Sequence, residues 1–134
     1  LPVLSQIALF FKTKILKINL LFCKKESDKM IGIDIVYLPE FRNKMKNSSL
    51  EKVFLQSELV QNKTLESLAG VFAAKEALFK ALGKKQNWLD TWIEKDKFGK
   101  PAIYSNLIDS TYKMEISIAH KNEYAIAVIL IWKH

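Results

Sequence analysis

Three ionisable residues lie on segments that are otherwise apolar: Asp34, Glu76 and His120. An unpaired charge held away from water costs several kcal/mol, so such a group neutralises or finds a partner. Two carboxylates from different elements can hold a hard cation such as Mg²⁺, whose remaining positions go to water and substrate phosphates. Lys80, one helical turn after Glu76, is placed to meet a phosphate as a point charge. The residue types therefore predict metal-assisted chemistry at a pyrophosphate.

Each position also has a simpler interpretation. Glu76 and Lys80 are four residues apart and could form a helical salt bridge worth roughly 0.2–0.5 kcal/mol. Asp34 could be a turn or cap residue at a strand end, and His120 a hydrogen-bonded histidine beside a hairpin. The residues alone leave both interpretations open, but the simpler ones do not explain why all three positions occur together.

The elements that must position these residues are an early strand, a long helix and a late strand. Residues 30–36 are short, β-branched and apolar, which predicts a strand. Thr64 can cap a helix over residues 65–82, and Gly83 suits its C-terminal end. His120 ends a strand, in register with that strand's apolar positions. The apolar positions expected to form one stripe on the helix are Leu65, Leu68, Ala69, Phe72 and Phe79.

The remaining pattern predicts an α+β fold, a mostly antiparallel sheet packed on one long helix. Pro39 suits the first turn of a short helix, and Ser57 can cap another. The further elements are expected at residues 38–46 and 57–61 (helices), 92–95, 102–104, 114–119 and 124–132 (strands), 98–101 and 121–123 (turns) and 84–89 (a basic loop).

Composition narrows the class of protein. The chain has 134 residues, enough for one domain with a real core. Cys23 is the single cysteine, so an internal disulfide is excluded and a reducing, cytoplasmic compartment is expected. The net charge is +7, but Arg42 is the only arginine, so the chain lacks the arginines interleaved with base-stacking aromatic residues that are typical of nucleic-acid binding. Nucleic acid is therefore not an expected partner.

Residues 1–29 differ from the rest of the chain. They carry six lysines against two acids, and their longest uncharged run, residues 1–11, is too short to span a bilayer. Stable membrane insertion is not expected. An amphipathic helix that lies on a membrane surface or binds a partner, or a targeting segment, remains an alternative. We favour an N-terminal extension outside the fold, with the domain covering residues 30–134.

Five short segments occur in a recognisable order and spacing. They are GIDIV at 32–36, SEL at 57–59, LAGVFAAKEALFKA at 68–81, GKP at 99–101 and SIAH at 117–120. Together they resemble the holo-acyl-carrier-protein synthases, the small bacterial type of 4′-phosphopantetheinyl transferase. The resemblance extends over residues 30–134.

This resemblance implies a reaction and a set of roles. Coenzyme A binds with its pyrophosphate on Mg²⁺, a serine hydroxyl of an apo acyl carrier protein attacks the β-phosphate, and 3′,5′-ADP leaves. Asp34 and Glu76 match the family's metal ligands, and Glu76 also suits the role of catalytic base. Lys80 matches the lysine that supports the phosphates. His120 matches a histidine that lines the coenzyme cleft.

The resemblance also implies an assembly and a nucleotide side of the cleft. Gly99, Lys100 and Pro101 match a turn that shapes this side. Small members of the family are trimers with active sites between subunits, and a homotrimer is expected here. A non-catalytic module of the same fold that binds coenzyme A or a carrier protein is the alternative function, and the presence of the matched site residues argues against it.

The chain departs from the family pattern at several positions. Glu40 occupies a place where many members carry an arginine thought to dock the carrier protein. Arg42, Lys44 and Lys46 could form that basic patch instead, or could be a solvated helix face. Val71 stands where an arginine is frequent, which removes a possible phosphate contact.

Loop 83–87 is a further departure, because it is shorter and more basic than the glycine-rich loop of many members. Its lysines could take over phosphate contacts, or the nucleotide pocket could have changed.

Overall fold

The computed structural model describes residues 29–84 and 87–134. The extension predicted at residues 1–29 lies outside these residues except for Lys29, which begins the first strand. Within the described residues, no helix is both long and apolar enough to cross a membrane. The elements are β1 (Lys29–Tyr37), α2 (Leu38–Lys46), η1 (Leu50–Lys52), α3 (Gln56–Gln61), α4 (Leu65–Leu82), η2 (Trp88–Asp90), β2 (Thr91–Lys95), β3 (Pro101–Ser105), β4 (Tyr112–Lys121) and β5 (Tyr124–Lys133).

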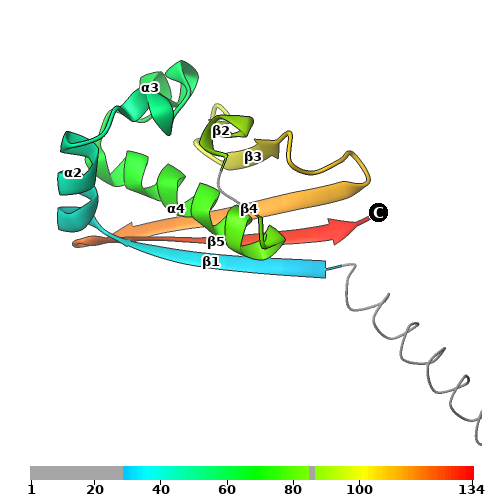
Figure 1. Ribbon diagram of the computed structural model, residues 1–134. Helices are drawn as coiled ribbons and strands as arrows, with labels where there is room; N and C mark the ends of the chain where they lie inside the picture. Colours follow the sequence, from blue (N-terminus) through cyan, green and yellow to red (C-terminus); the bar gives the residue numbers. More distant parts are fainter. Residues whose placement is uncertain (1–28, 85–86) are drawn as a thin grey trace, which may run out of the picture.

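Helix α4 lies across one face of a three-stranded antiparallel sheet, and the β2–β3 hairpin lies on the other side of the helix (Figure 1). The α+β prediction is confirmed, but the strands form two sheets rather than one, with orders β1-β5-β4 and β2-β3. In the larger sheet Asp34 and Ile118 both pair with Ala127, so they occupy the same level on the two outer strands.

Strand β1 alternates between buried and exposed residues. Gly32, Asp34 and Val36 face α4, whereas Ile33 and Ile35 point away from the helix and are exposed. The apolar run recognised in the sequence therefore contains two different surfaces. One is packed against α4, and the other is left open on the outer face of the sheet.

Helix α4 approaches β1 very closely at Gly32. A Cβ atom built on Gly32 would lie 1.9 Å from the carbonyl oxygen of Ala77. Such contact between backbones is possible only without a side chain on the strand and with small residues on the helix. This approach sets the distance between the site residues of α4 and those of β1.

The ends of α4 are those that the sequence predicted. Thr64 Oγ1 accepts a hydrogen bond from the Ser67 amide at 3.2 Å, and Gly83 ends the helix with φ of 59°. The prediction of a single apolar stripe is wrong, because residues 69–75 and 77–79 are all buried. The sheet covers one side of the helix, and the layer of α3 and β2–β3 covers much of the other.

Helix α3 begins differently from the prediction. Ser57 was expected to cap it, but the helix starts at Gln56, and the backbone amide of Leu55 donates to Glu58 Oε2 at 2.9 Å. The glutamate of the SEL motif, in the first turn of the helix, therefore caps the N-terminus of α3 by accepting this hydrogen bond. Loop 84–89 contains residues 85 and 86, which lie outside the described residues, and its end forms part of η2.

Replacing Gly32 with alanine is expected to lower the free energy of unfolding by about 1–3 kcal/mol or more, because the new methyl group would overlap backbone atoms of α4. Urea denaturation monitored by circular dichroism measures this change. Gly83→Ala is the matched control. It strains a positive φ but meets nothing within 4 Å, so its cost should stay near 1 kcal/mol. Equal costs for the two variants would contradict the close packing of α4 on β1.

Candidate active site

The carboxyl groups of Asp34 and Glu76 are neighbours, one presented by the middle of β1 and the other by α4. Asp34 is 6% exposed, and Glu76 is partly buried. Burial raises the pKa of Glu76, and the negative charge of Asp34 raises it further. The structure therefore brings together the two acids that the sequence predicted to share a site.

Lys80 compensates this pair only in part. Its Nζ donates to Asp34 Oδ1 at 2.5 Å and also lies 3.4 Å from the carbonyl oxygen of Ile33. Asp34 Oδ2 is buried and has no hydrogen-bond partner among the described residues. An unpaired buried carboxylate oxygen is costly, so the site is short of positive charge.

These contacts exclude two of the simpler interpretations. Lys80 pairs with Asp34 across elements, and Asp34 lies in mid-strand rather than at a strand end. The Lys80 side chain is 58% exposed, which leaves its ammonium accessible to an incoming anion.

The donor set fits magnesium better than zinc. Among residues 29–84 and 87–134 there is no cluster of three or more His, Cys, Asp and Glu side chains that could hold a metal. Structural and catalytic zinc sites need three or four protein ligands, whereas Mg²⁺ accepts one or two carboxylates and keeps water and phosphate oxygens. Asp34 and Glu76 are the residues that would hold such an ion.

Lys44 of α2 is a second cation beside the pair. It lines a hollow together with Glu76 and Phe72, and its charge lowers the pKa of Glu76 against the effects of burial and Asp34. Its Nζ lies 4.9 Å from the centroid of the Phe72 ring. This lysine therefore lies beside the Glu76 carboxyl group. Glu40 lines the same hollow.

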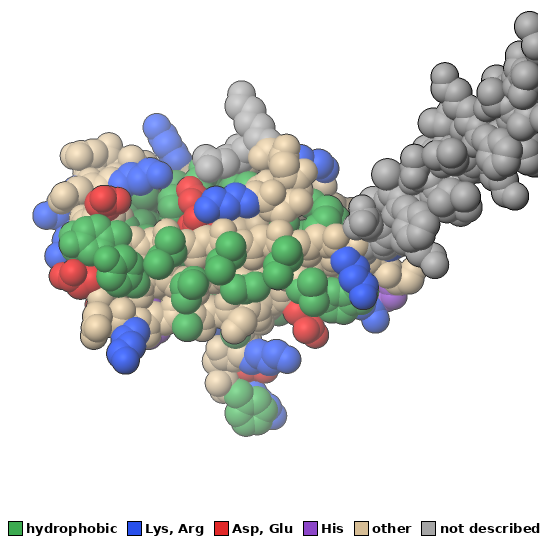
Figure 2. Space-filling model, turned by 90° about the horizontal axis from the view of Figure 1, so that it is seen from below, with side chains coloured by type: hydrophobic (Ala, Val, Ile, Leu, Met, Phe, Trp, Pro, Cys, Tyr) green, Lys and Arg blue, Asp and Glu red, His purple; other side chains and the backbone are tan. Residues whose placement is uncertain are grey.

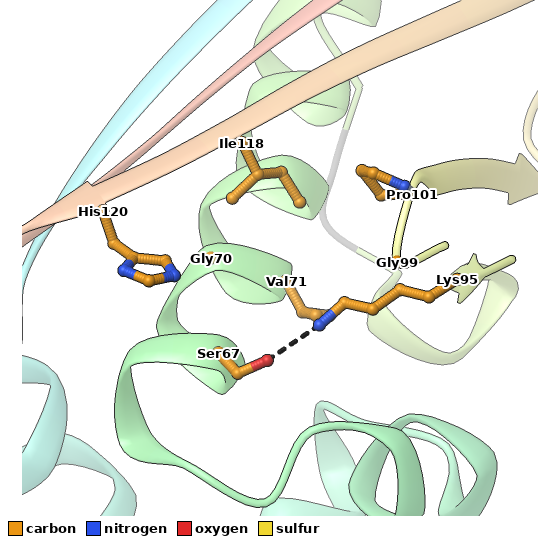
Figure 3. Close-up of a pocket in the computed structure, with 8 residues that line it drawn as sticks. All are labelled: Ser67, Gly70, Val71, Lys95, Gly99, Pro101, Ile118 and His120. Carbon is orange, nitrogen blue, oxygen red and sulfur yellow. Dashed lines mark hydrogen bonds between the residues drawn. The ribbon is translucent and has the colours of Figure 1, made fainter. Parts of the chain in front are cut away.

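A second pocket lies between α4, the end of β4 and the β2–β3 hairpin (Figure 3). His120, near the end of β4, and Pro101, on the hairpin, both line it. The family resemblance assigns these two residues to the coenzyme cleft. Lys100 does not line this pocket but a neighbouring hollow along the hairpin. The lining residues of the pocket are Ser67, Gly70, Val71, Lys95, Gly99, Pro101, Ile118 and His120.

Within one chain, this pocket and the carboxylate pair are separated by the helix. Each helical residue turns about 100°, so Gly70 and Val71 project roughly 120–140° away from Glu76 around the axis. The sheet repeats this separation, because the pair lies on the β1 edge and the pocket on the β4 edge. The structure thus groups Asp34, Glu76 and Lys80 but leaves His120 apart from them.

A buried ion pair that sequence reasoning missed anchors α4. Lys75 Nζ lies 2.7 Å from Glu58 Oε2, and both side chains are fully buried. Lys75 also donates to the carbonyl oxygens of Val53 and Trp88, and Glu58 Oε1 accepts from the Ile93 amide. Burial lowers the pKa of Lys75, and its pairing with Glu58 opposes that shift.

A sequence signal for this ion pair was available. Lys75 lies three residues after Phe72 and four before Phe79, the same kind of spacing that drew attention to Glu76. The pair ties α4 to α3 and β2, and so holds the helix that carries Glu76 and Lys80.

The sequence of the chain is similar to those of known phosphopantetheinyl transferases. The family model for the 4′-phosphopantetheinyl transferase superfamily (ACPS) matches residues 30–129. A holo-[acyl-carrier-protein] synthase of Nautilia profundicola is 35% identical over 113 residues, which cover 78% of this chain and 100% of that protein.

Two solved structures have the same fold. The Helicobacter pylori holo-[acyl-carrier-protein] synthase in complex with coenzyme A is 38% identical, with a TM-score of 0.64 over 76% of this chain and 99% of that one. A Bacillus anthracis synthase in complex with coenzyme A (3′,5′-ADP) is 30% identical, with a TM-score of 0.68 over 78% of this chain and 96% of that one.

The raised pKa of Glu76 predicts how stability depends on pH without metal. The folded chain binds this proton more tightly than the unfolded chain, whose ordinary value is 4.5. The stabilisation by the neutral acid is complete below that value and is lost as pH rises through the folded pKa. In EDTA at pH 7, Glu76→Gln should therefore have a higher free energy of unfolding than the wild type.

Urea denaturation of both proteins between pH 4 and pH 8 tests this sign. The advantage of Glu76→Gln should shrink as pH falls towards 4.5, because the wild-type acid becomes neutral. Millimolar Mg²⁺ should stabilise the wild type more than the variant, since glutamine is a weaker ligand. If the wild type were more stable than Glu76→Gln in EDTA at pH 7, the negative charges of Asp34 and Glu76 would already be neutralised by neighbouring residues.

Proposed function

The chain belongs to the holo-acyl-carrier-protein synthases of the 4′-phosphopantetheinyl transferase superfamily, as its sequence predicted, and we propose that Asp34, Glu76 and Lys80 carry its reaction. The phosphopantetheine group moves from coenzyme A to a serine of an apo acyl carrier protein, and 3′,5′-ADP is released. The observation that carries the proposal is the unpaired, buried Oδ2 of Asp34 beside the Glu76 carboxyl group.

Magnesium is the cofactor that these residues suit. Asp34 and Glu76 would hold the ion, which when bound neutralises charge on the diphosphate oxygens. Lys80 is already fixed at one end of the pair by Asp34, and its exposed ammonium can contact a phosphate oxygen of the coenzyme. These residues thus supply the positioning and charge stabilisation on which phosphoryl transfer depends.

Glu76 is the group suited to accept the proton of the attacking serine. The serine oxygen forms a bond to the β-phosphorus, the bond from that phosphorus to the bridging oxygen breaks, and 3′,5′-ADP departs with that oxygen. A carboxyl group whose pKa is raised towards the working pH is a better proton acceptor than an ordinary glutamate. Lys44 limits this shift and so keeps the carboxylate form accessible.

We further propose a homotrimer, as the family resemblance implies. The face of the sheet opposite α4 carries a continuous band of hydrophobic side chains (Figure 2). Ile31 of β1 is 70% exposed, and such a patch on a soluble protein marks an interface. The exposed members on β1 and β5 are Ile31, Ile33, Ile35, Tyr37, Tyr124 and Leu130.

The separation of the Asp34–Glu76 pair from the pocket beside His120 supports the same assembly. One coenzyme molecule cannot easily reach both sides of α4 within a single chain. If copies associate, the pocket beside His120 of one copy can face the Asp34–Glu76 pair of the next. The coenzyme would then lie between subunits, in the cytoplasmic compartment that the sequence predicts.

Mass spectrometry of an apo acyl carrier protein incubated with coenzyme A and Mg²⁺ tests the transfer. The wild type should add one phosphopantetheine to the carrier. Asp34→Asn and Glu76→Gln should each lower the rate by about 10²–10⁴-fold, as expected for loss of a metal ligand or a general base.

Glu66→Gln, which neutralises an exposed carboxylate on the same helix, should keep the wild-type rate. Coenzyme binding by the wild type without any gain in carrier mass would instead identify a binding module.

The assembly is tested by Ile33→Glu, which places a charge on the outer face of the sheet. Light scattering after size exclusion should show a trimer for the wild type and a smaller species for this variant, with transfer activity reduced at least tenfold. Val60→Glu changes a similarly exposed residue on α3 and should alter neither property. A fully active wild-type monomer would refute the shared site.

A further inference from the structure

Lys95 is a lysine held in a fixed position without a carboxylate partner. Its Nζ donates to Asn62 Oδ1 at 2.6 Å. It also donates to Ser67 Oγ at 2.9 Å (Figure 3). Both partners are neutral, and none of the ion pairs among residues 29–84 and 87–134 includes Lys95. An ammonium group has three donors, so one N–H is left for a further acceptor.

The two acceptors are themselves fixed. Asn62 is 2% exposed, and its Nδ2 donates to the carbonyl oxygen of Glu58 at 2.8 Å. The Ser67 hydroxyl donates to Asn62 Oδ1 at 2.6 Å. A lysine on an exposed surface samples many rotamers, whereas this network orders Lys95 before any ligand arrives, which lowers the entropic cost of binding.

The ordered ammonium lines the second pocket, next to Val71 (Figure 3). The pocket is otherwise apolar along its floor, where a Cβ on Gly70 would lie 2.7 Å from Ile118 Cγ2. His120 stands on the opposite side of the pocket. The lining thus offers one fixed positive charge and a histidine, an arrangement suited to a small anion.

Coenzyme A carries two separate anionic groups, its diphosphate and the 3′-phosphate of its ribose. The proposed function assigns the diphosphate to the Asp34–Glu76 pair. We propose, on the basis of that function, that Lys95 binds the 3′-phosphate and makes the enzyme selective for coenzyme A over 3′-dephospho-coenzyme A. Many family members carry an arginine at the position of Val71. Lys95 extends from β2 to the side of Val71 and supplies a positive charge there, which valine lacks.

Steady-state kinetics with both coenzymes test this assignment. The wild type should prefer coenzyme A, and Lys95→Met should raise KM for coenzyme A by about 10- to 100-fold, the effect of losing a hydrogen bond to a charged group. KM for 3′-dephospho-coenzyme A should change less than threefold. Lys95→Arg should restore much of the preference. Lys97→Met, which removes an equal charge from the adjacent exposed hairpin, should leave both KM values unchanged.

A parallel binding experiment separates this inference from the proposed function. Calorimetry should show that the wild type binds 3′,5′-ADP at least tenfold more tightly than 5′-AMP, and that Lys95→Met abolishes the difference, whether or not transfer occurs. Equal losses of affinity for both nucleotides in a folded Lys95→Met protein would overturn the inference and leave Lys95 a structural residue. A wild type that binds with this preference but transfers nothing would overturn only the proposed function.

Discussion

The enforced proximity of two carboxyl groups is the constraint around which this molecule is organised. Strand β1 presents Asp34 to the helix, and the missing side chain of Gly32 lets α4 come close enough to bring Glu76 beside it. Lys80 satisfies one oxygen of Asp34, and a second oxygen remains buried and unpaired. Two acids with a single direct lysine partner form the site that we propose to be completed by a divalent cation and an anionic substrate.

Helix α4 carries two of the proposed catalytic residues and separates them from the second pocket. Its register is held by the Lys75–Glu58 pair, which is buried deeply enough that losing either partner would leave an uncompensated charge. On the β1 side the helix offers Glu76 and Lys80, and on the β4 side it forms the floor of the pocket that contains Lys95. In the proposed trimer, each chain would contribute two half-sites, and copies would associate through the apolar outer face of the sheet.

Local signals account for what the sequence predicted correctly. Thr64 and Gly83 delimit α4 through hydrogen bonds and backbone conformation within a few residues, so no tertiary information was needed. The acids stood out because a charge on an apolar element is costly wherever the element packs. The prediction that Ser57 caps α3 was wrong, although serine is a good capping residue. The helix starts one residue earlier, at Gln56, and the buried Glu58 side chain accepts a hydrogen bond from the backbone at its start.

The sequence by itself determined the family, the α+β class, the long helix and the identity of Asp34, Glu76 and Lys80, because motif order and local free energies depend only on neighbouring residues. Tertiary structure alone decided that Lys80 pairs with Asp34, that Lys75 is buried, that His120 lies across the helix from the acids, and that Lys95 is fixed beside Val71. The lysine contacts among these join residues 17 to 46 positions apart. All four features depend on how α4 is rotated and seated on the sheet. That rotation and seating are set by the sum of all packing contacts rather than by any local pattern.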